Sequence, residues 1–340
     1  YFVAEVTDRR NGVHNTFGIW RITASVDGVP YFEYRMDGFT HDLSRCCDAV
    51  SCYPLQLDSR NEAIRLARLA GSPDCFYPTM EEHGVVRTDE GQLRRIRIEA
   101  EDDCGNRSAL EFTVRGRSES FRAEADTAAV AIYPDRTSLV QVGREARAII
   151  PEGALYEPIF VNPERREAPQ ADSGVVVLSP AYRFLNPDTP LRHPAAVTIR
   201  TRVPRPLQLQ TVLAVRNRKG RLSSIGGSYA NGAVTATTYA TGDLAVVADT
   251  LPPSIRPLFA EGADLSKSES LRFRVADNFS GIASWTLRID GEWVPCDRFP
   301  MKGTLVHFFG NPAQRRKHEV QLSVRDGCGN TAHFKGIFYR

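Results

Sequence analysis

Two short stretches carry the same set of side chains that could do chemistry, "EDDCGN" (Glu101–Asn106) and "RDGCGN" (Arg325–Asn330). Each places a carboxylate, a thiol and an amide close together, which would suit an active site, a metal site, or one structural module used twice. The structural interpretation is favoured, because an Asp side chain can accept hydrogen bonds from nearby backbone amides while Gly and Asn tolerate positive φ. The predicted structural turn residues are Asp102, Gly105, Asn106, Asp326, Gly329 and Asn330.

The loops also contain oxygen atoms that could bind a hard cation. The calcium candidates are Asp277, Asp326 and Asn330, provided that their loops meet at one end of a sandwich. Calcium takes about six to eight oxygen ligands, and these residues supply only two carboxylates and some carbonyl oxygens, so ordinary Asx turns are favoured. The stretch "CCDAVSC" (Cys46–Cys52) has neither Cys-x-x-Cys spacing nor a nearby His pair, which argues against zinc.

No catalytic motif stands out in the chain. It has no Gly-x-Ser-x-Gly elbow, no Walker loop and no His-x-His or His-Glu-x-x-His, and its seven histidines are scattered. We therefore predict no catalytic residue and no cofactor in this chain. Aromatic side chains that could stack on sugars are expected to pack in the core instead; they are Trp20, Trp285, Trp293, Tyr31 and Tyr34.

The elements around the two turns are predicted to be β-strands that repeat. Ahead of the first turn, "RIRIEA" alternates apolar and polar residues, and "HEVQLSV" does the same ahead of the second. Further upstream, "VTDRRNGVHNTFGIWRITASVDGVP" (Val6–Pro30) parallels "VADNFSGIASWTLRIDGEWVP" (Val275–Pro295). Both contain Asp-Gly between strands, a strong hairpin signal. Two copies of one all-β module account for the repeat.

Three consecutive β-sandwich domains are predicted, the first and third related by this repeat. Residues 1–116 form an Ig-like sandwich with an insertion at 40–90, residues 117–250 a second sandwich, and residues 251–340 an Ig-like sandwich again. Within the insertion, "SRNEAIRLARLAG" (Ser59–Gly71) predicts a short helix from the spacing of its apolar residues. The Pro-rich stretch "DTLPPSIRP" (Asp249–Pro257) marks the junction before the last module.

Bulk composition narrows the partners and the compartment. A net charge of +2 provides no field that would attract nucleic acid, and no apolar run is long enough to suggest a membrane span. The seven cysteines fall only in the outer thirds, as expected for disulfides in an oxidising compartment. Cys296 and Cys328 are expected to pair, since each has only the other as a local partner. The pairing of the remaining cysteines stays open: Cys46, Cys47, Cys52, Cys75 and Cys104.

The ordered set of motifs resembles one family. The motifs are "FGIWRITASVDGVPYFEYRMDGFTHDLSR", "IEAEDDCGNRSALEFTV", "IIPEGALYEPIF", "YANGAVTATTYATGDLAVVADTLPP" and "RVADNFSGIASWTLRIDGEWV". Together they resemble the C-terminal β-rich region of lysostaphin-type (LytM-like) zinc endopeptidases of Bacteroidota envelopes, over essentially the whole chain. The middle segment, with "IIPEGAL" and "LSPAYRFLNPDTPLRHPAAVTI", also resembles the ZU-type sandwich of ankyrins and netrin receptors.

The resemblance implies a function but transfers no site residue. The family's zinc site needs an upstream His with an Asp and a His-x-His strand, which no position here matches, so zinc is expected only in a catalytic domain outside this chain. Cys46-Cys47 follow "HDLSR" where relatives tend to have Tyr-Ile, which leaves the disulfide pattern open. Because the chain has no initiator Met and opens inside a strand-like stretch, we expect it to be a fragment that lacks its N-terminal part.

Three functional hypotheses follow. The first is a non-catalytic scaffold of a secreted cell-envelope peptidase that acts on peptidoglycan or envelope protein, positioning the catalytic domain or docking it to a cell-wall or outer-membrane partner in the periplasm. The second is a stand-alone adhesion module that binds glycan or protein. The third is a hydrolase with an unfamiliar site, which a poised His beside an Asp and a nucleophile would support. The oligomeric state, the binding partner and the rigidity between modules stay open.

Overall fold

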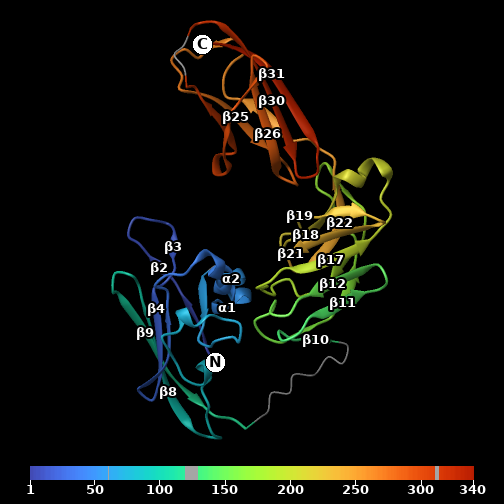
Figure 1. The fold of residues 1–340 in the computed structure, drawn as a ribbon. Helices are drawn as coiled ribbons and strands as arrows, with labels where there is room; N and C mark the ends of the chain where they lie inside the picture. The colour runs from blue at the N-terminus through green and yellow to red at the C-terminus, as the bar shows by residue number, and fades with distance from the viewer. Residues whose placement is uncertain (60, 119–128, 311–313) are drawn as a thin grey trace. The chain divides into compact units, whose positions relative to one another are not determined.

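The structure is a computed structural model that describes residues 1–59, 61–118, 129–310 and 314–340. The chain divides into two compact units. The first unit comprises residues 1–140, 149–163 and 185–195, and the second comprises residues 141–148, 164–184 and 196–340. Strands dominate both units, which confirms the predicted all-β class with several sheets (Figure 1).

The first module is built on a five-stranded sheet of order β7-β5-β4-β8-β9. Its strands are β4 (Arg21–Val26), β5 (Val29–Arg35), β7 (Thr79–Met80), β8 (Leu93–Glu101) and β9 (Arg107–Arg115). Alternate residues on one face, among them Ile22, Phe32 and Ile96, are almost completely buried. The alternation of apolar and polar residues in the sequence thus places the apolar side chains on the buried face of the sheet and the polar ones on the other face, as expected.

Short elements complete this module. They are β1 (Val3–Val6), β2 (Asp8–Arg9), β3 (Thr16–Phe17), α1 (Cys47–Val50), α2 (Tyr53–Ser59) and β6 (Glu62–Arg65), with 3₁₀ turns at His41–Cys46, Asp74–Phe76 and Glu82–Gly84. The helix predicted over Ser59–Gly71 is wrong. Its residues Ala63 and Ile64 are buried on β6, which pairs antiparallel with β1. A partner strand from the start of the chain satisfies the backbone of this apolar run, and no local pattern could reveal it.

The middle of the chain contains two larger sheets. One has the order β11-β12-β17-β21-β20, and the other the order β14-β16-β22-β18-β19 with β15 also paired to β22. Their bounds are β11 (Ser138–Val142), β12 (Ala146–Ile150), β17 (Ala195–Arg200), β20 (Ser228–Ala230), β21 (Ala233–Thr238), β14 (Glu164–Arg166), β15 (Val175–Val177), β16 (Ala181–Arg183), β18 (Thr211–Arg216), β19 (Leu222–Gly226) and β22 (Asp243–Asp249). A separate pair joins β10 (Val130–Ile132) to β13 (Ile159–Val161), and a 3₁₀ turn spans Arg205–Gln210. Every residue of β22 is buried, so this strand is the centre of its sheet.

The last module has two sheets, of orders β23-β25-β29-β28 and β24-β31-β30-β26-β27. Their strands are β23 (Ser254–Pro257), β24 (Ala263–Asp264), β25 (Ser270–Ala276), β26 (Ile282–Ile289), β27 (Glu292–Val294), β28 (Asp297–Phe299), β29 (Thr304–Phe308), β30 (Lys317–Asp326) and β31 (Thr331–Tyr339), and a 3₁₀ turn spans Pro300–Lys302. Leu271, Phe273, Leu305, Val320 and Leu322 form the core between them.

The internal repeat is visible in the strand order. The run β5-β4-β8-β9 of the first module corresponds to β27-β26-β30-β31 of the last. Both predicted Asp-Gly hairpins are formed, with Asp27 and Gly28 at φ of 51° and 84°, and Asp290 and Gly291 at 53° and 84°. Positive φ at both central residues is the geometry of a type I′ turn, which matches the right-handed twist of the flanking strands.

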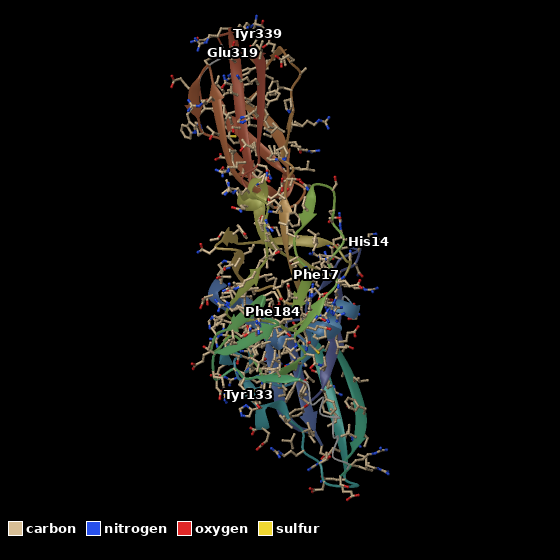
Figure 2. The ribbon with its side chains drawn as sticks, turned by 90° about the vertical axis from the view of Figure 1, so that its right-hand side faces the viewer. His14, Phe17, Tyr133, Phe184, Glu319 and Tyr339 are labelled. Atoms are coloured by element: carbon tan, nitrogen blue, oxygen red, sulfur yellow. The ribbon has the colours of Figure 1, made fainter. Side chains whose placement is uncertain are left out.

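No helix in the described part of the chain is long and apolar enough to cross a bilayer. Several aromatic side chains are nevertheless exposed on strands or beside them, among them Phe17, Tyr133 and Tyr339, each labelled in Figure 2.

Candidate functional site at the two repeated turns

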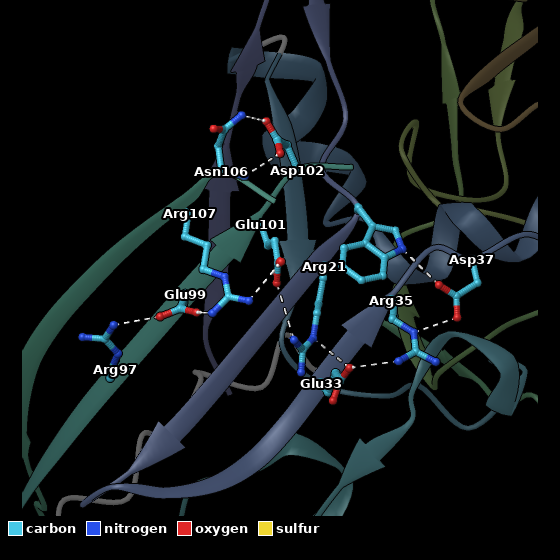
Figure 3. A network of polar contacts seen from close by, with 11 residues as sticks. Arg21, Glu33, Arg35, Asp37, Arg97, Glu99, Glu101, Asp102, Asn106 and Arg107 are labelled. Carbon is cyan, nitrogen blue, oxygen red and sulfur yellow. Dashed lines mark hydrogen bonds and ion pairs between the residues drawn. The ribbon is translucent and has the colours of Figure 1, made fainter. Parts of the chain in front are cut away.

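The first repeated turn, between β8 and β9, is held together by its own side chains. Asp102 Oδ1 accepts hydrogen bonds from the backbone N–H groups of Cys104 (2.9 Å) and Asn106 (2.8 Å), and its Oδ2 accepts one from Asn106 Nδ2 at 2.6 Å (Figure 3). The Asn106 side chain and these amides lower the pKa of the Asp102 carboxyl. Gly105 takes a φ of 85°, which Gly adopts without steric cost. The Asp102 carboxylate is therefore occupied in shaping the turn.

A network of ion pairs lies next to this turn on the polar face of the sheet (Figure 3). Glu101 is only 8% exposed. Its carboxylate forms ion pairs with Arg107 on β9 at 3.1 Å and with Arg21 on β4 at 3.5 Å. Arg21 continues the network to Glu33 on β5 at 2.9 Å. Each charge is matched by an opposite charge on a neighbouring strand, so the network stabilises strand pairing.

The second turn, between β30 and β31, repeats the same bonds. Asp326 Oδ1 accepts from the N–H groups of Cys328 (2.9 Å) and Asn330 (2.8 Å), and Asp326 Oδ2 accepts from Asn330 Nδ2 at 2.8 Å. Gly329 has a φ of 88°. Unlike the first turn, this one is buried: Asp326 is 1% exposed and Cys328 is 4% exposed.

The second turn is buried because it packs against the middle sandwich, within the second compact unit. Asn330 Nδ2 donates a second hydrogen bond to the backbone oxygen of Asp249, the last residue of β22, at 2.9 Å. The side chain of Gln210 donates to Asn330 Oδ1. Cys328 packs with Val175, Val212, Ala214, Leu222 and Val247 of the middle sheet. We call this contact between the second turn and the middle sandwich the joint.

Three carboxylates meet at the joint: Asp249, Asp277 and Asp326, with oxygen atoms within 4.8 Å of one another. At an effective dielectric constant of about 20, two full charges at this separation repel each other by about 3 kcal/mol. Burial raises the pKa of the Asp249 carboxyl, and the charges of Asp277 and Asp326 add to that effect. The cluster therefore favours a positive charge at its centre.

The sequence indicated only part of this cluster. Asp277 and Asp326 come together, as required of calcium ligands, but the Asn330 amide is used by Gln210, Asp249 and Asp326. The candidates drawn from the sequence do not include Asp249. Asp249 could have been found from its place at the end of the wholly buried strand "DLAVVAD". A carboxylate buried there needs hydrogen bonds or a cation to compensate for its lost hydration.

The expected Cys296–Cys328 disulfide is absent, and all seven cysteines are free thiols. Cys296 packs against the core of the last module, whereas Cys328 packs with residues of the middle sheet. Nearness in sequence was a poor guide because the two cysteines belong to different hydrophobic clusters.

One histidine lies beside an Asp, but the repeat shows that the pair is structural. His318 Nδ1 is 2.8 Å from Asp290 Oδ2 at the second Asp-Gly hairpin. In the first module Arg94 occupies the same place, 2.8 Å from Asp27 Oδ2. Both Asp residues also accept a backbone N–H from the neighbouring strand, at 2.8 Å in each case. These pairs close the hairpins.

The aromatic residues divide between core and surface. Tyr34 (1% exposed) and Tyr31 (7%) are buried, as expected. Trp20 Nε1 donates to Asp37 Oδ1, and Trp285 packs against the core of the last module. Trp293 is the exception, because it is 63% exposed on β27.

Comparison with known proteins supports the interpretation of the middle region. Residues 134–249 match the family model of the Zu5-like domain, which confirms the ZU-type sandwich predicted there. No curated protein sequence matches the chain. One of the solved structures that match is titled "Structural insight into host cell surface retention of a 1.5-MDa bacterial ice-binding adhesin". The alignment covers 95% of this chain and 86% of the chain in that structure, at 11% sequence identity. The TM-score of this match is 0.15, so the two folds do not superpose.

Proposed function

We propose that this chain is a non-catalytic scaffold of a cell-envelope protein, whose second repeated turn fixes the last module to the Zu5-like sandwich. The observation that carries the proposal is the joint itself. Asn330 makes the same bond within its turn as Asn106 does, and it then adds two contacts to the middle sandwich, to Asp249 and from Gln210. Burial of Cys328 among aliphatic side chains adds an apolar contact.

A scaffold must hold its modules at a constant separation, and this can be measured. Spin labels at exposed positions of the middle sandwich (Lys219) and of the last module (Met301) should give one narrow distance distribution. Replacing Asn330 with Ala should broaden the distribution, while Asn106→Ala should leave it unchanged. A broad distribution in the wild-type chain would show that the modules move independently, and the scaffold proposal would then be wrong.

The resemblance to lysostaphin-type endopeptidases extends the proposal to a specific role. On that basis the scaffold positions a zinc peptidase domain in the envelope, and this chain contributes no zinc ligand and no general base. The coding sequence of the parent protein tests the role directly. It should contain a domain with the His/Asp pair and the His-x-His strand, and a parent protein without these motifs would remove the peptidase role.

A second candidate, glycan or protein binding at the cell surface, is favoured by Trp293. This indole is 63% exposed beside the second Asp-Gly hairpin, and exposed Trp side chains commonly stack on ligands. Glycan-array binding that Trp293→Ala abolishes would support adhesion, and unchanged binding in that variant would exclude this residue as the contact.

A further inference from the structure

We propose that Asp249, Asp277 and Asp326 bind one calcium ion at the joint between the Zu5-like sandwich and the last module. The inference deepens the scaffold proposal, on which it rests, by giving the joint a ligand. It also explains why three acidic residues from separate segments meet where hydrophobic contact alone would suffice.

The charge at the joint is not balanced by the protein itself. Asp249 is fully buried and Asp326 is 1% exposed. The hydrogen bonds that these two carboxylates accept come from neutral donors: the N–H groups of Leu251, Ser280, Cys328 and Asn330, and the Asn330 amide. In the part of the chain that the structure describes, no Arg or Lys forms an ion pair with any of the three. Buried carboxylates without a cation are strongly disfavoured.

An unsatisfied oxygen atom provides the second observation. Asp277 Oδ2 accepts the backbone N–H groups of Phe279 (3.0 Å) and Gly281 (2.7 Å), but Asp277 Oδ1 is buried and has no hydrogen-bond partner. A buried oxygen atom is rarely left without a donor or a cation, so Asp277 Oδ1 points to a missing positive ligand.

Donor type favours calcium. Ca²⁺ takes oxygen ligands at about 2.3–2.6 Å in a flexible geometry, whereas Mg²⁺ demands a near-ideal octahedron and usually keeps several waters. The carboxylate oxygens lie within 4.8 Å of one another, close enough to share one ion. Water would complete the coordination.

Calcium titration of the EDTA-treated full chain by isothermal calorimetry tests the proposal. The wild-type chain should bind one Ca²⁺, and saturation should raise its Tm. Asp277→Asn should weaken the affinity at least about tenfold, because the amide oxygen can still accept the two backbone N–H groups while the charge is lost. Asp103→Asn is the matched control: Asp103 belongs to the exposed acidic group of the first turn, and its replacement should change nothing.

Three results would overturn the calcium site. The first is a folded wild-type chain, checked by circular dichroism, that takes up no calcium at millimolar concentration. The second is calcium binding that Asp277→Asn leaves intact. The third is preference for Zn²⁺ that Cys328→Ser abolishes, which would indicate a thiolate site. The spin-label distances in EDTA separate the two proposals: a narrow distribution without calcium binding leaves the scaffold intact, whereas a broad distribution in EDTA and in calcium removes the scaffold itself.

Discussion

Replacing Asn330 with Ala should destabilise the chain much more than the equivalent change in the first turn. Asn330→Ala removes three hydrogen bonds, to Asp326 Oδ2, to the Asp249 carbonyl and from Gln210. Asn106→Ala removes one, to the half-buried Asp102 carboxylate. The two turns have the same local sequence pattern and the same internal bonds, so the pair of variants isolates the contribution of the joint.

The magnitude follows from the number and burial of these bonds. A hydrogen bond contributes about 1 kcal/mol net, and leaving a buried partner unsatisfied costs about 1–3 kcal/mol. Asn106→Ala should therefore cost about 1 kcal/mol, because water can replace the lost bond. Asn330→Ala should cost about 4 kcal/mol, because Asp249 is fully buried and its carbonyl oxygen loses the Asn330 donor.

Native-state hydrogen exchange is the appropriate assay, since a chain with several modules need not unfold in one step. The amides of Cys328 and of β22 should lose about 4 kcal/mol of opening free energy in Asn330→Ala. The amide of Cys104 should lose about 1 kcal/mol in Asn106→Ala. Equal losses in the two variants would refute the argument, because they would mean that the contacts to Asp249 and Gln210 contribute nothing.

Three further predictions concern other parts of the chain. Burial alone would raise the pKa of the Asp243 carboxyl, but Arg216 and Arg183 outweigh it and hold the pKa below its ordinary value. The ionised carboxylate should therefore stabilise the fold above pH 4, and this contribution should be lost as the pH falls further. Urea titrations should show that the free energy of unfolding depends less on pH below pH 4 in Asp243→Asn than in the wild-type chain. Gly84→Ala should lower the Tm and cost about 2 kcal/mol or more, because Gly84 has a φ of 82° and a Cβ there would lie 2.4 Å from the Leu66 carbonyl oxygen. In the folded chain an aromatic disulfide reagent should modify the exposed thiol of Cys104 quickly and the buried thiol of Cys328 only on unfolding.

Local patterns in the sequence predicted the hairpins and the repeat well. Asp27-Gly28 and Asp290-Gly291 specify their turns through a backbone conformation that few other residue pairs adopt, so two adjacent residues are enough to predict each turn. The alternation around Ile96 likewise needs no knowledge of the partner strand beyond the presence of one buried face. These features are local, which is why sequence reasoning reached them.

Features that depend on distant segments were missed. Ala63 and Ile64 have the spacing of a helix, and the strand that pairs with them, β1, is the distant start of the chain. In the sequence Asp249 is simply the first residue of a Pro-rich junction. No residue near it indicates that Asp277 and Asp326 lie beside it in the fold. The expected Cys296–Cys328 bond is wrong for a related reason, because sequence separation does not report which hydrophobic cluster a residue joins.

One residue explains why two copies of the same turn have different environments. The second turn has Gly327 where the first has Asp103, and a Cβ at Gly327 would lie 2.7 Å from the Ser280 carbonyl oxygen. The backbone N–H of Gly327 donates to the Gly281 carbonyl at 2.9 Å, so the turn packs directly on the loop that carries Asp277. A side chain at this position would force the loop away from the turn.

Exchanging these residues tests that explanation in both directions. Gly327→Asp should separate the turn from the 277–281 loop and place a fourth carboxylate at the joint, so it should broaden the spin-label distance distribution and lower the Tm. The reciprocal change, Asp103→Gly, should have little effect, because Asp103 is exposed and takes no part in the hydrogen bonds that join Asp102 to Cys104 and Asn106. If Gly327→Asp kept both the narrow distribution and the wild-type Tm, close packing at Gly327 could not be what distinguishes the joint from the exposed turn.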